Sequence, residues 1–208
     1  MVVQRTIAAR AANVAVTIPA PTFDPRSSAQ LDTAILAGGC FWGLEAVYEH
    51  VKGVKSVVAG YTGGDLADPT YNIVSTGMTG HAESVLVAYD PRIVSYGTLL
   101  EVFFGVVHDP TTLNRQGPDH GTQYRSAIFY RDSGQQHTAQ SYVAQLERAH
   151  AFDAAIVTQL SAAKPFYSAE DEHQHYFDRH PYAPYIMIND APKVTRLRKQ
   201  LPALWVDR

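Results

Sequence analysis

The sequence predicts a two-layer α/β or α+β sandwich, with helices packed on a mixed sheet. Segments with strand patterns and segments with helical spacing are intermixed along the chain, and the strands are few. The chain has 208 residues, of which 46% are hydrophobic, so it can bury a sizeable core and one domain is the expected count. There are no internal repeats and no low-complexity tracts.

Residues 1–30 are predicted to be a flexible extension, and residues 31–208 a single domain. Arg5 and Arg10 lie among alanines, no acidic residue precedes Asp24, and three prolines interrupt any helix. An acid-poor start with arginines raises the possibility of a targeting or export segment. Its apolar run is too short and too polar for an export signal, which favours an arm lying against the domain.

The chain is organised around a strand, a turn and a helix between residues 31 and 51. The apolar run at 34–36 is typical of a buried strand, and two glycines end it. After Cys40, apolar residues recur at helical spacing, so a helix begins at or just after Cys40. The only cysteine therefore lies at a helix N-terminus, where free N–H groups favour negative charge. Such sites can lower a thiol pKa from ~8.5 to ~3.5–7.5, as a nucleophile requires.

Two further strands and a helix follow this element. The valine-rich segment 54–61 predicts a strand, and the loop after it runs to about Gly80 and carries Tyr71. A loop of that length in a compact domain is more often functional than idle. The alternation over 82–89 predicts a strand with Glu83 near its beginning. Ser95 is expected to cap a helix that extends through residue 107.

The second half of the chain begins with a polar loop at 108–122. This loop delivers Asp119 and His120, and Tyr124 lies just past its end. Patterning predicts a strand over 123–130, a helix over 133–150 and a short strand near 155–159. A serine cap followed by acidic residues at 168–172 predicts a helix that carries His173, His175 and Tyr176. Residues 193–205 predict a last helix that docks on the body of the domain.

Five stretches of this chain resemble the A-type peptide methionine sulfoxide reductases, in the family's order. They are GCFWG at 39–43, GYTGG at 60–64, TGHAESV at 79–85, RQGPDHGTQYRS at 115–126 and FYSAEDEHQHYF at 166–177. The resemblance covers most of the chain, from Ala34 to Asp190. It implies reduction of methionine S-sulfoxide, free or in proteins, on an α+β fold similar to the ferredoxin-like arrangement, with no cofactor.

The resemblance also assigns roles to individual residues. Cys40 matches the nucleophile, and Glu83 matches the carboxyl group that protonates the sulfoxide oxygen. Tyr71 and Tyr124 match hydroxyls that hydrogen-bond that oxygen, and Asp119 matches a carboxylate near the substrate or the tyrosines. The remaining matches form an aromatic wall for the sulfoxide methyl group: Phe41 and Trp42.

The chemistry of sulfoxide reduction asks for the same residue types. A sulfoxide sulfur is a weak electrophile until its oxygen is protonated, so a thiolate must lie beside an acid that is still protonated near neutral pH. An aromatic, poorly solvated pocket raises a carboxyl pKa by disfavouring the charged form. Phenol hydroxyls stabilise charge that develops on oxygen. Attack by Cys40 then releases methionine and leaves a cysteine sulfenic acid.

The single cysteine departs from many family members, which carry further cysteines near the C-terminus. Tyr185 stands about where a resolving cysteine would be. Regeneration must therefore use an outside thiol: a small thiol cleared by a glutaredoxin-like protein, or a thioredoxin-like protein acting on Cys40 directly. A lone thiol is at home in the reducing cytoplasm, although export or organelle targeting by residues 1–30 stays open. We expect a monomer.

Two other functions stay open at this point. Nucleic acid and a membrane, in contrast, are not expected as partners. His81 or His120 could act as a base for Cys40, as in a cysteine hydrolase or acyltransferase. Alternatively, a His-rich module could bind a divalent metal ion. Its ligands would be His173, His175 and His180, with Asp171 and Glu172. The net charge of −3 gives no basic footprint for nucleic acid, and no apolar run approaches the ~20 residues that span a bilayer.

Overall fold

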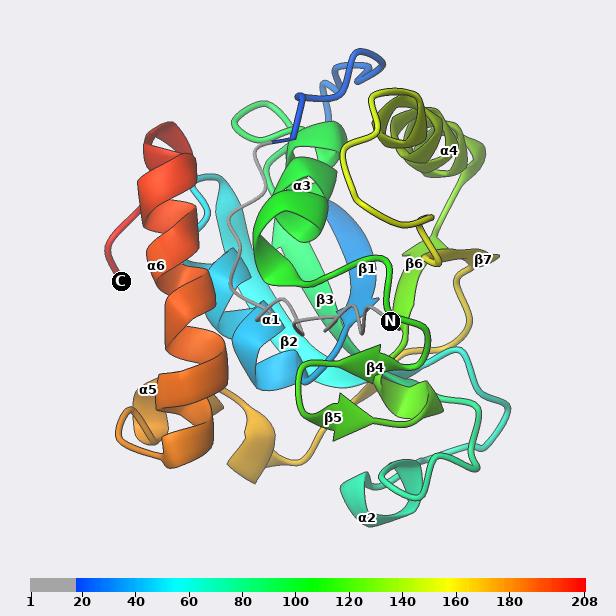
Figure 1. Cartoon of the computed structure of the whole chain (residues 1–208), viewed down its shortest axis with the longest axis vertical. Coiled ribbons are helices and arrows are strands. Elements are labelled where there is room, and N and C mark those ends of the chain that lie inside the picture. Colours follow the sequence, from blue (N-terminus) through cyan, green and yellow to red (C-terminus); the bar gives the residue numbers. More distant parts are fainter. Residues whose placement is uncertain (1–17) are drawn as a thin grey trace, which may run out of the picture.

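The computed structural model describes residues 18–208 and shows a six-stranded mixed sheet with helices packed on it (Figure 1). The strands are ordered β7-β6-β1-β3-β2-β8, and only the β6–β7 pair is parallel. These strands span Asp32–Gly38 (β1), Val54–Thr62 (β2), Ala82–Tyr89 (β3), Ser126–Tyr130 (β6), Gln159–Ala162 (β7) and Tyr167–Ser168 (β8). The predicted α+β sandwich is confirmed.

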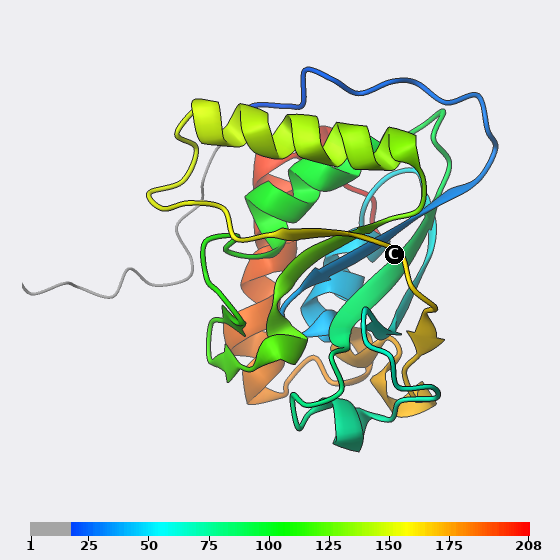
Figure 2. The ribbon, with the colours of Figure 1, turned by 90° about the vertical axis from the view of Figure 1, so that its right-hand side faces the viewer.

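The four central strands and the two helices between them form a ferredoxin-like βαββαβ unit. Helix α1 (Phe41–Glu49) connects β1 to β2, and helix α3 (Tyr96–Val102) lies in the connection from β3 to β6. Helices α4 (Ser133–Arg148) and α6 (Ala191–Gln200) follow β6 and complete the helical layer. Figure 2 shows these helices gathered on one side of the sheet.

The strands contribute alternate side chains to two apolar clusters. In β1, Ala34 and Leu36 face the larger cluster beneath the helices, and Ile35 and Ala37 face a smaller cluster on the opposite side. This is the period-two alternation of a strand that is buried on both faces. The apolar run at 34–36 is thus the centre of the sheet, as the sequence predicts, and it carries the chain directly to Cys40.

Side-chain caps fix the residues at which helices α3 and α4 begin. Ser95 Oγ accepts a hydrogen bond from the N–H of Thr98 (3.2 Å), which confirms the predicted N-cap of α3. The expected helix extends to residue 107 as predicted, but its last turn, Phe103–Val107, widens into a π-helix. Asp132 caps α4 by accepting the N–H of Gln135 (2.8 Å).

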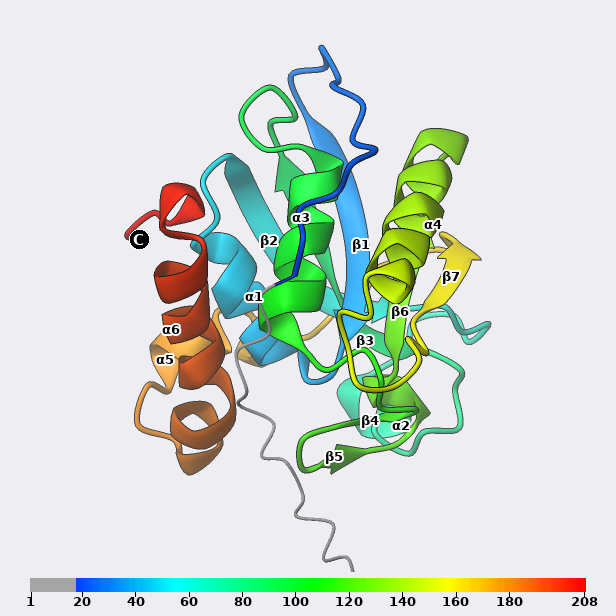
Figure 3. The same ribbon diagram turned by 45° about the horizontal axis from the view of Figure 1, so that its top comes forward.

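The described part of the N-terminal extension lies along the helices (Figure 3). The Tyr142 hydroxyl donates to the carbonyl of Pro19 (2.8 Å), and the N–H of Gly97 donates to Asp24 (3.0 Å). These contacts fit an arm lying against the domain; residues 1–17 lie outside the described residues. Within residues 18–208, no helix is long and apolar enough to cross a membrane.

The predicted helix opening at residues 168–172 is wrong. Residues 167–168 form β8 on the edge of β2, Asp171–His173 form one 3-10 turn, and the helix α5 spans only Tyr176–Arg179. Tertiary contacts override the local capping pattern here. The side chain of Gln174 accepts from the N–H of Ala59 and donates to its carbonyl, both at 3.0 Å. This segment is therefore tied to the sheet edge before a helix can extend.

Smaller differences concern the loops and two strands. The expected strand near 155–159 forms as β7, at Gln159–Ala162, and the strand expected from 123 begins at 126. The loop after β2 contains the short helix α2 (Tyr71–Val74). The loop at 108–122 contains a hairpin and leads into a 3-10 turn: β4 (Arg115–Gln116), β5 (Asp119–His120) and Thr122–Tyr124. Figure 1 shows α2, this hairpin and α5 at the same, lower end of the molecule.

Candidate active site

Cys40 is the N-cap residue of α1, directly after the strand that precedes it. Gly39 makes the turn between them with φ +99°, a backbone conformation that residues with a Cβ rarely adopt. A Cβ at Gly39 would also lie 2.7 Å from the Cβ of Gln116. The thiol is a buried group, with 7% of Cys40 exposed. The predicted position at a helix N-terminus is therefore what the structure shows.

A buried ion pair lies against the first turn of α1. The carboxylate of Asp190 occupies the space where a Cβ of Gly43 would be, which explains the second glycine of the GCFWG stretch. Lys193 Nζ donates to Asp190 Oδ1 at 3.0 Å, and the Asp190 side chain has no exposed surface. The negative end of this pair thus lies near the positive end of the α1 dipole.

Glu83 reaches the same helix terminus from β3. Its Oε2 accepts the backbone N–H of Phe41 at 3.1 Å, and only 1% of the residue is exposed. The pKa of Glu83 is raised to about 8: burial is the main cause, the Phe41 N–H opposes it, and the nearby carboxylates of Asp119 and Asp190 add to the rise. At neutral pH this carboxyl is therefore mostly protonated and can donate a proton.

The pKa of Cys40 moves in the direction opposite to the sequence-based expectation. Burial raises it well above the ordinary thiol value, with Glu83 and Asp190 adding to the rise. The N–H of Trp42 and the charge of Lys193 lower it, but these effects are smaller. A helix N-terminus is thus not enough to make a thiolate when the thiol is desolvated and faces carboxyl groups. The resting thiol is protonated.

Tyr71 and Tyr124 come from different loops and share the electrostatic environment of Cys40. Both phenols are half-buried, burial raises the pKa of each, and the charges of Glu83 and Cys40 raise both further. Tyr71 begins α2, where its N–H donates to Glu170 (2.8 Å). Both hydroxyls are therefore neutral hydrogen-bond donors at any physiological pH.

Asp119 is hydrogen-bonded to Tyr185, a residue that lies 66 positions further along the chain. The Tyr185 hydroxyl donates to Asp119 Oδ2, and burial raises the pKa of Asp119. Burial also raises the pKa of Tyr185, and the nearby charge of Cys40 is the next largest cause. Tyr185, expected from the sequence to stand about where a resolving cysteine would be, is thus a phenol that lies in this site.

The two aromatic residues after the cysteine differ in exposure. Phe41 has no exposed surface and packs between Tyr61 and His173, with ring centroids 5.7 and 5.6 Å away. Trp42 is half-buried and stacks on Tyr176, with centroids 3.8 Å apart. Trp42 is therefore the one with surface to offer a ligand, and Phe41 supports the site from the core.

Neither of the two histidines predicted as a general base lies next to the cysteine. His81 is buried, its Nε2 is bonded to the carbonyl of Leu66 (2.8 Å), and its Nδ1 accepts the N–H of Gly64 (3.3 Å). His120 is exposed on β5, and no histidine is among the charges that act on Cys40. In the described part of the chain, the Cys–His pair of a cysteine hydrolase is absent.

The predicted His-rich metal set is not assembled either. His173 is buried beside the ring of Tyr71 (4.2 Å between centroids), and the His180 ring lies tilted against that of Tyr176 (4.2 Å). His175 instead turns toward α1. The three imidazoles therefore do not converge on one point.

Comparison with known proteins decides between the functions that were left open. The family model for peptide methionine sulfoxide reductase matches residues 32–204. The chain belongs to this family. It is therefore an oxidoreductase, and the family that the five sequence stretches predict is confirmed.

Individual relatives agree with the family match. The reductase is 51% identical over 185 residues to peptide methionine sulfoxide reductase MsrA 2 of Mesorhizobium japonicum, covering 89% of this chain and 95% of that protein. Among solved structures, it is similar to methionine sulfoxide reductase A of Corynebacterium diphtheriae, with a TM-score of 0.64, 36% identity and coverage of 77% and 81%. The reduced form of Mxr1 from Saccharomyces cerevisiae gives a TM-score of 0.64 at 33% identity, with coverage of 78% and 92%.

Sequence reasoning missed several residues that shape this reductase site. The sequence points to Tyr185 only as a replaced cysteine, to Asp190 only as the end of the resemblance, and to Lys193 only as the start of the last helix. Glu170 was not singled out, although it accepts both the Tyr61 hydroxyl (2.9 Å) and the N–H of Tyr71. The one available signal for Glu170 is its place in the stretch at 166–177. Contacts over such separations leave no periodic trace in a sequence.

Proposed function

We propose that this reductase converts the S epimer of methionine sulfoxide, free or in proteins, to methionine through a sulfenic acid on Cys40. The observation that carries the proposal is Glu83, a buried carboxyl with a pKa of about 8 whose Oε2 accepts the N–H of the residue that follows Cys40. Such an acid keeps its proton at neutral pH, where the sulfoxide oxygen needs one. No other described carboxyl is bonded to the first turn of α1 from the sheet side.

The roles of the residues follow from this acid. Glu83 protonates the sulfoxide oxygen, with Tyr71 and Tyr124 as hydrogen-bond donors to it, and this makes the sulfur electrophilic. Cys40 gives its proton back to the Glu83 carboxylate and attacks the sulfur. The bond between the two sulfurs and the substrate S–O bond then break as the hydroxyl group passes to the Cys40 sulfur. This leaves Cys40 as a sulfenic acid, two electrons more oxidised, and releases the substrate sulfur as a thioether with those two electrons. Protons and electrons balance without a cofactor.

Substrate recognition is assigned to the aromatic residues and to Asp119. Trp42 is half-buried and follows the core residue Phe41, and its ring offers apolar surface to the sulfoxide methyl group. Asp119, held by Tyr185, is positioned to orient the tyrosine hydroxyls or the substrate backbone. This division places the polar end of the sulfoxide toward Glu83 and its methyl group toward the rings.

Recycling needs a thiol from outside the chain. Cys40 is the only cysteine, so the sulfenic acid cannot condense within the chain to a disulfide. A thioredoxin-like protein, or a small thiol followed by a glutaredoxin-like protein, is the reductant that fits. Such reductants are abundant in a reducing compartment such as the cytoplasm. We also infer that residues 31–208 form the catalytic domain and act as a monomer.

An assay with the separated epimers tests the proposal. With excess dithiothreitol, the chain should release methionine from the S epimer and not from the R epimer, and Cys40→Ser should abolish the reaction. The same two epimers are tested in free methionine and in an oxidised peptide. Equal turnover of both epimers, or turnover by Cys40→Ser, would overturn the proposal.

A further inference from the structure

We propose that Glu45, Glu49 and His175 form a binding site for one divalent transition-metal ion, of which Zn²⁺ fits best. The site lies on α1 and does not depend on the proposed reaction: neither glutamate is among the charges that act on Cys40. Among the described residues, this is the one group of three or more histidine, cysteine or acidic side chains whose ligand atoms gather closely enough to hold an ion, all within 4.8 Å of one another.

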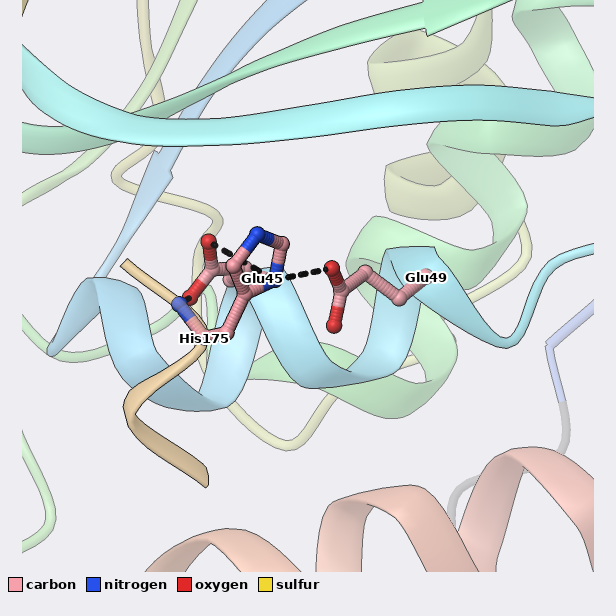
Figure 4. Close-up of side chains that lie close together, drawn as sticks. All are labelled: Glu45, Glu49 and His175. Carbon is pink, nitrogen blue, oxygen red and sulfur yellow. Dashed lines mark hydrogen bonds and ion pairs between the residues drawn. The ribbon is translucent and has the colours of Figure 1, made fainter. Parts of the chain in front are cut away.

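The geometry brings two parts of the chain together (Figure 4). Glu45 and Glu49 lie four residues apart on α1 and so share one face of the helix. His175 comes from the segment before α5, and its Nδ1 lies 2.7 Å from Glu49 Oε1 and 3.9 Å from Glu45 Oε1. Its backbone N–H donates to the other oxygen, Glu45 Oε2, at 2.8 Å. One oxygen of Glu45 thus holds the backbone, and the other points to the imidazole.

The second of these oxygens is what points to a ligand. Glu45 is a buried residue, 1% exposed, and its Oε1 has no hydrogen-bond partner among residues 18–208. A buried carboxyl oxygen without a partner is costly, and here a second carboxyl group, that of Glu49, lies one helical turn away. His175 Nδ1 can make only one hydrogen bond of this kind, and the nearer oxygen is Glu49 Oε1, at 2.7 Å against 3.9 Å for Glu45 Oε1. A cation between the three groups gives Glu45 Oε1 the partner that it lacks.

The ligand types and spacings suit zinc. Zn²⁺ binds imidazole nitrogen and carboxylate oxygen at about 2.0–2.1 Å, and a tetrahedral ion then separates its ligand atoms by about 3.3 Å. The two separations from Nδ1, 2.7 and 3.9 Å, lie on either side of that value, so small rotations of the side chains suffice. The His175 side chain is 51% exposed, which leaves a fourth position open to water. Mg²⁺ and Ca²⁺ prefer oxygen ligands alone and fit this set less well.

A bound ion would join α1 to the segment that supports Trp42. Tyr176, the residue after His175, stacks on Trp42, and Gln174, the residue before it, is bonded to the edge of β2. The ion, bound by Glu45 and Glu49 on α1 and by His175, would therefore cross-link α1 to this segment next to the aromatic wall. We expect the ion to raise the melting temperature of the chain, because it binds the folded state and the unfolded chain offers no assembled site.

Calorimetric titration of the full chain with Zn²⁺ alone tests the site. The protein is freed of metal with a chelator and carries Cys40→Ser, so that the thiol cannot contribute. The expected result is one ion per chain, with affinity lowered by more than about 100-fold in His175→Ala and in Glu49→Gln, because loss of a ligand exceeds the 10–100-fold cost of losing an outer-shell partner. His180→Ala, which removes an exposed imidazole of the same segment, is the matched control and should bind as the parent does.

Two results would overturn the site. One is the absence of binding at millimolar Zn²⁺ in equilibrium dialysis, which would leave the cluster as a network that shares protons. The other is binding that His175→Ala and Glu49→Gln weaken no more than His180→Ala does. Near-ultraviolet circular dichroism of every variant excludes misfolding as the cause of lost binding, and Glu49→Gln keeps the shape of the side chain at the less buried of the two glutamates. Because no activity is measured, the outcome is independent of the proposed reaction.

Discussion

The Glu83→Gln variant should lose less stability than the parent chain as the pH rises from acidic to alkaline. The substitution also removes the proposed general acid. The pKa of Glu83 is about 8 in the folded chain, against an ordinary value of 4.5, and burial is the main cause. At 1.36 kcal/mol per pKa unit, the ionised form of this carboxyl is disfavoured in the folded chain by about 5 kcal/mol. Glutamine has no ionised form, so it does not carry this penalty.

The sign follows from where the proton is bound more tightly. Because the folded chain holds the Glu83 proton up to a pKa of about 8 and the unfolded chain loses it near the ordinary value of 4.5, stability falls as pH rises through this window. Integrated from pH ~5 to pH ~8.5, the free energy of unfolding of the parent should fall by about 4 kcal/mol relative to Glu83→Gln. The contributions of the other titrating groups are the same in both chains and cancel in this difference. They do not cancel in the absolute stability of either chain.

Urea unfolding at these two pH values, with a reductant present, measures the difference. Glu147→Gln makes the same glutamate-to-glutamine replacement at an exposed position of α4, where no buried carboxyl is removed, and is the control. A buried amide that lacks partners costs about 1–3 kcal/mol, but this cost is the same at both pH values. A pH-dependent difference below about 1 kcal/mol for Glu83→Gln would refute the reasoning that Glu83 is protonated because it is buried.

Four further outcomes are expected. Glu83→Ala should lose ~10²–10⁴-fold in kcat, the usual worth of a general acid, whereas Glu83→Gln should keep part of the activity because an amide still donates to oxygen; wild-type turnover by the alanine variant would exclude the role. Trp42→Ala should raise KM more than it lowers the melting temperature, and a loss of ~3–5 kcal/mol with unchanged KM would make it a core residue instead. Tyr185→Phe should lower kcat by about tenfold or more, through the lost hydrogen bond to the Asp119 carboxylate, in steady-state assays with a melt as control. After one turnover without reductant, a dimedone-type trap should add a single label to Cys40 per methionine released, and a free Cys40 thiol after that turnover would contradict the mechanism.

The fold could be predicted from the sequence because its signals are local. The buried strand before Cys40 and the helix after it are periodic patterns a few residues long, and Ser95 is a cap that acts three residues away. The segment after residue 168 shows where such signals end. Its serine and acidic residues satisfy a local capping rule, but Gln174 bonds to Ala59, 115 positions earlier, and this contact prevails.

The site could be predicted in its residue types and not in its electrostatics. The spacing predicts Cys40 at a helix N-terminus correctly, but the lowered thiol pKa expected from that position is wrong, because the pKa is raised. Charge at that terminus depends on Glu83 and Asp190, which lie 43 and 150 positions further along the sequence, and on burial, which no single stretch reveals. Tyr185 shows the same limit, because a phenol and a carboxylate 66 positions apart form a pair only through the fold.

The raised pKa values of Cys40 and Glu83 explain why it is useful for the proposed nucleophile to be buried. A permanent thiolate would attack any oxidant that reached it, whereas a thiol that stays protonated at rest reacts little. In the proposed reaction the thiolate becomes favourable only when Glu83 has passed its proton to a sulfoxide oxygen, because positive charge then develops on the substrate sulfur beside the thiol. Desolvation therefore opposes ionisation of the free enzyme and strengthens the attraction within the complex, since both effects grow as the local dielectric constant falls. A buried thiol beside a buried acid thus couples the appearance of the nucleophile to the presence of its substrate.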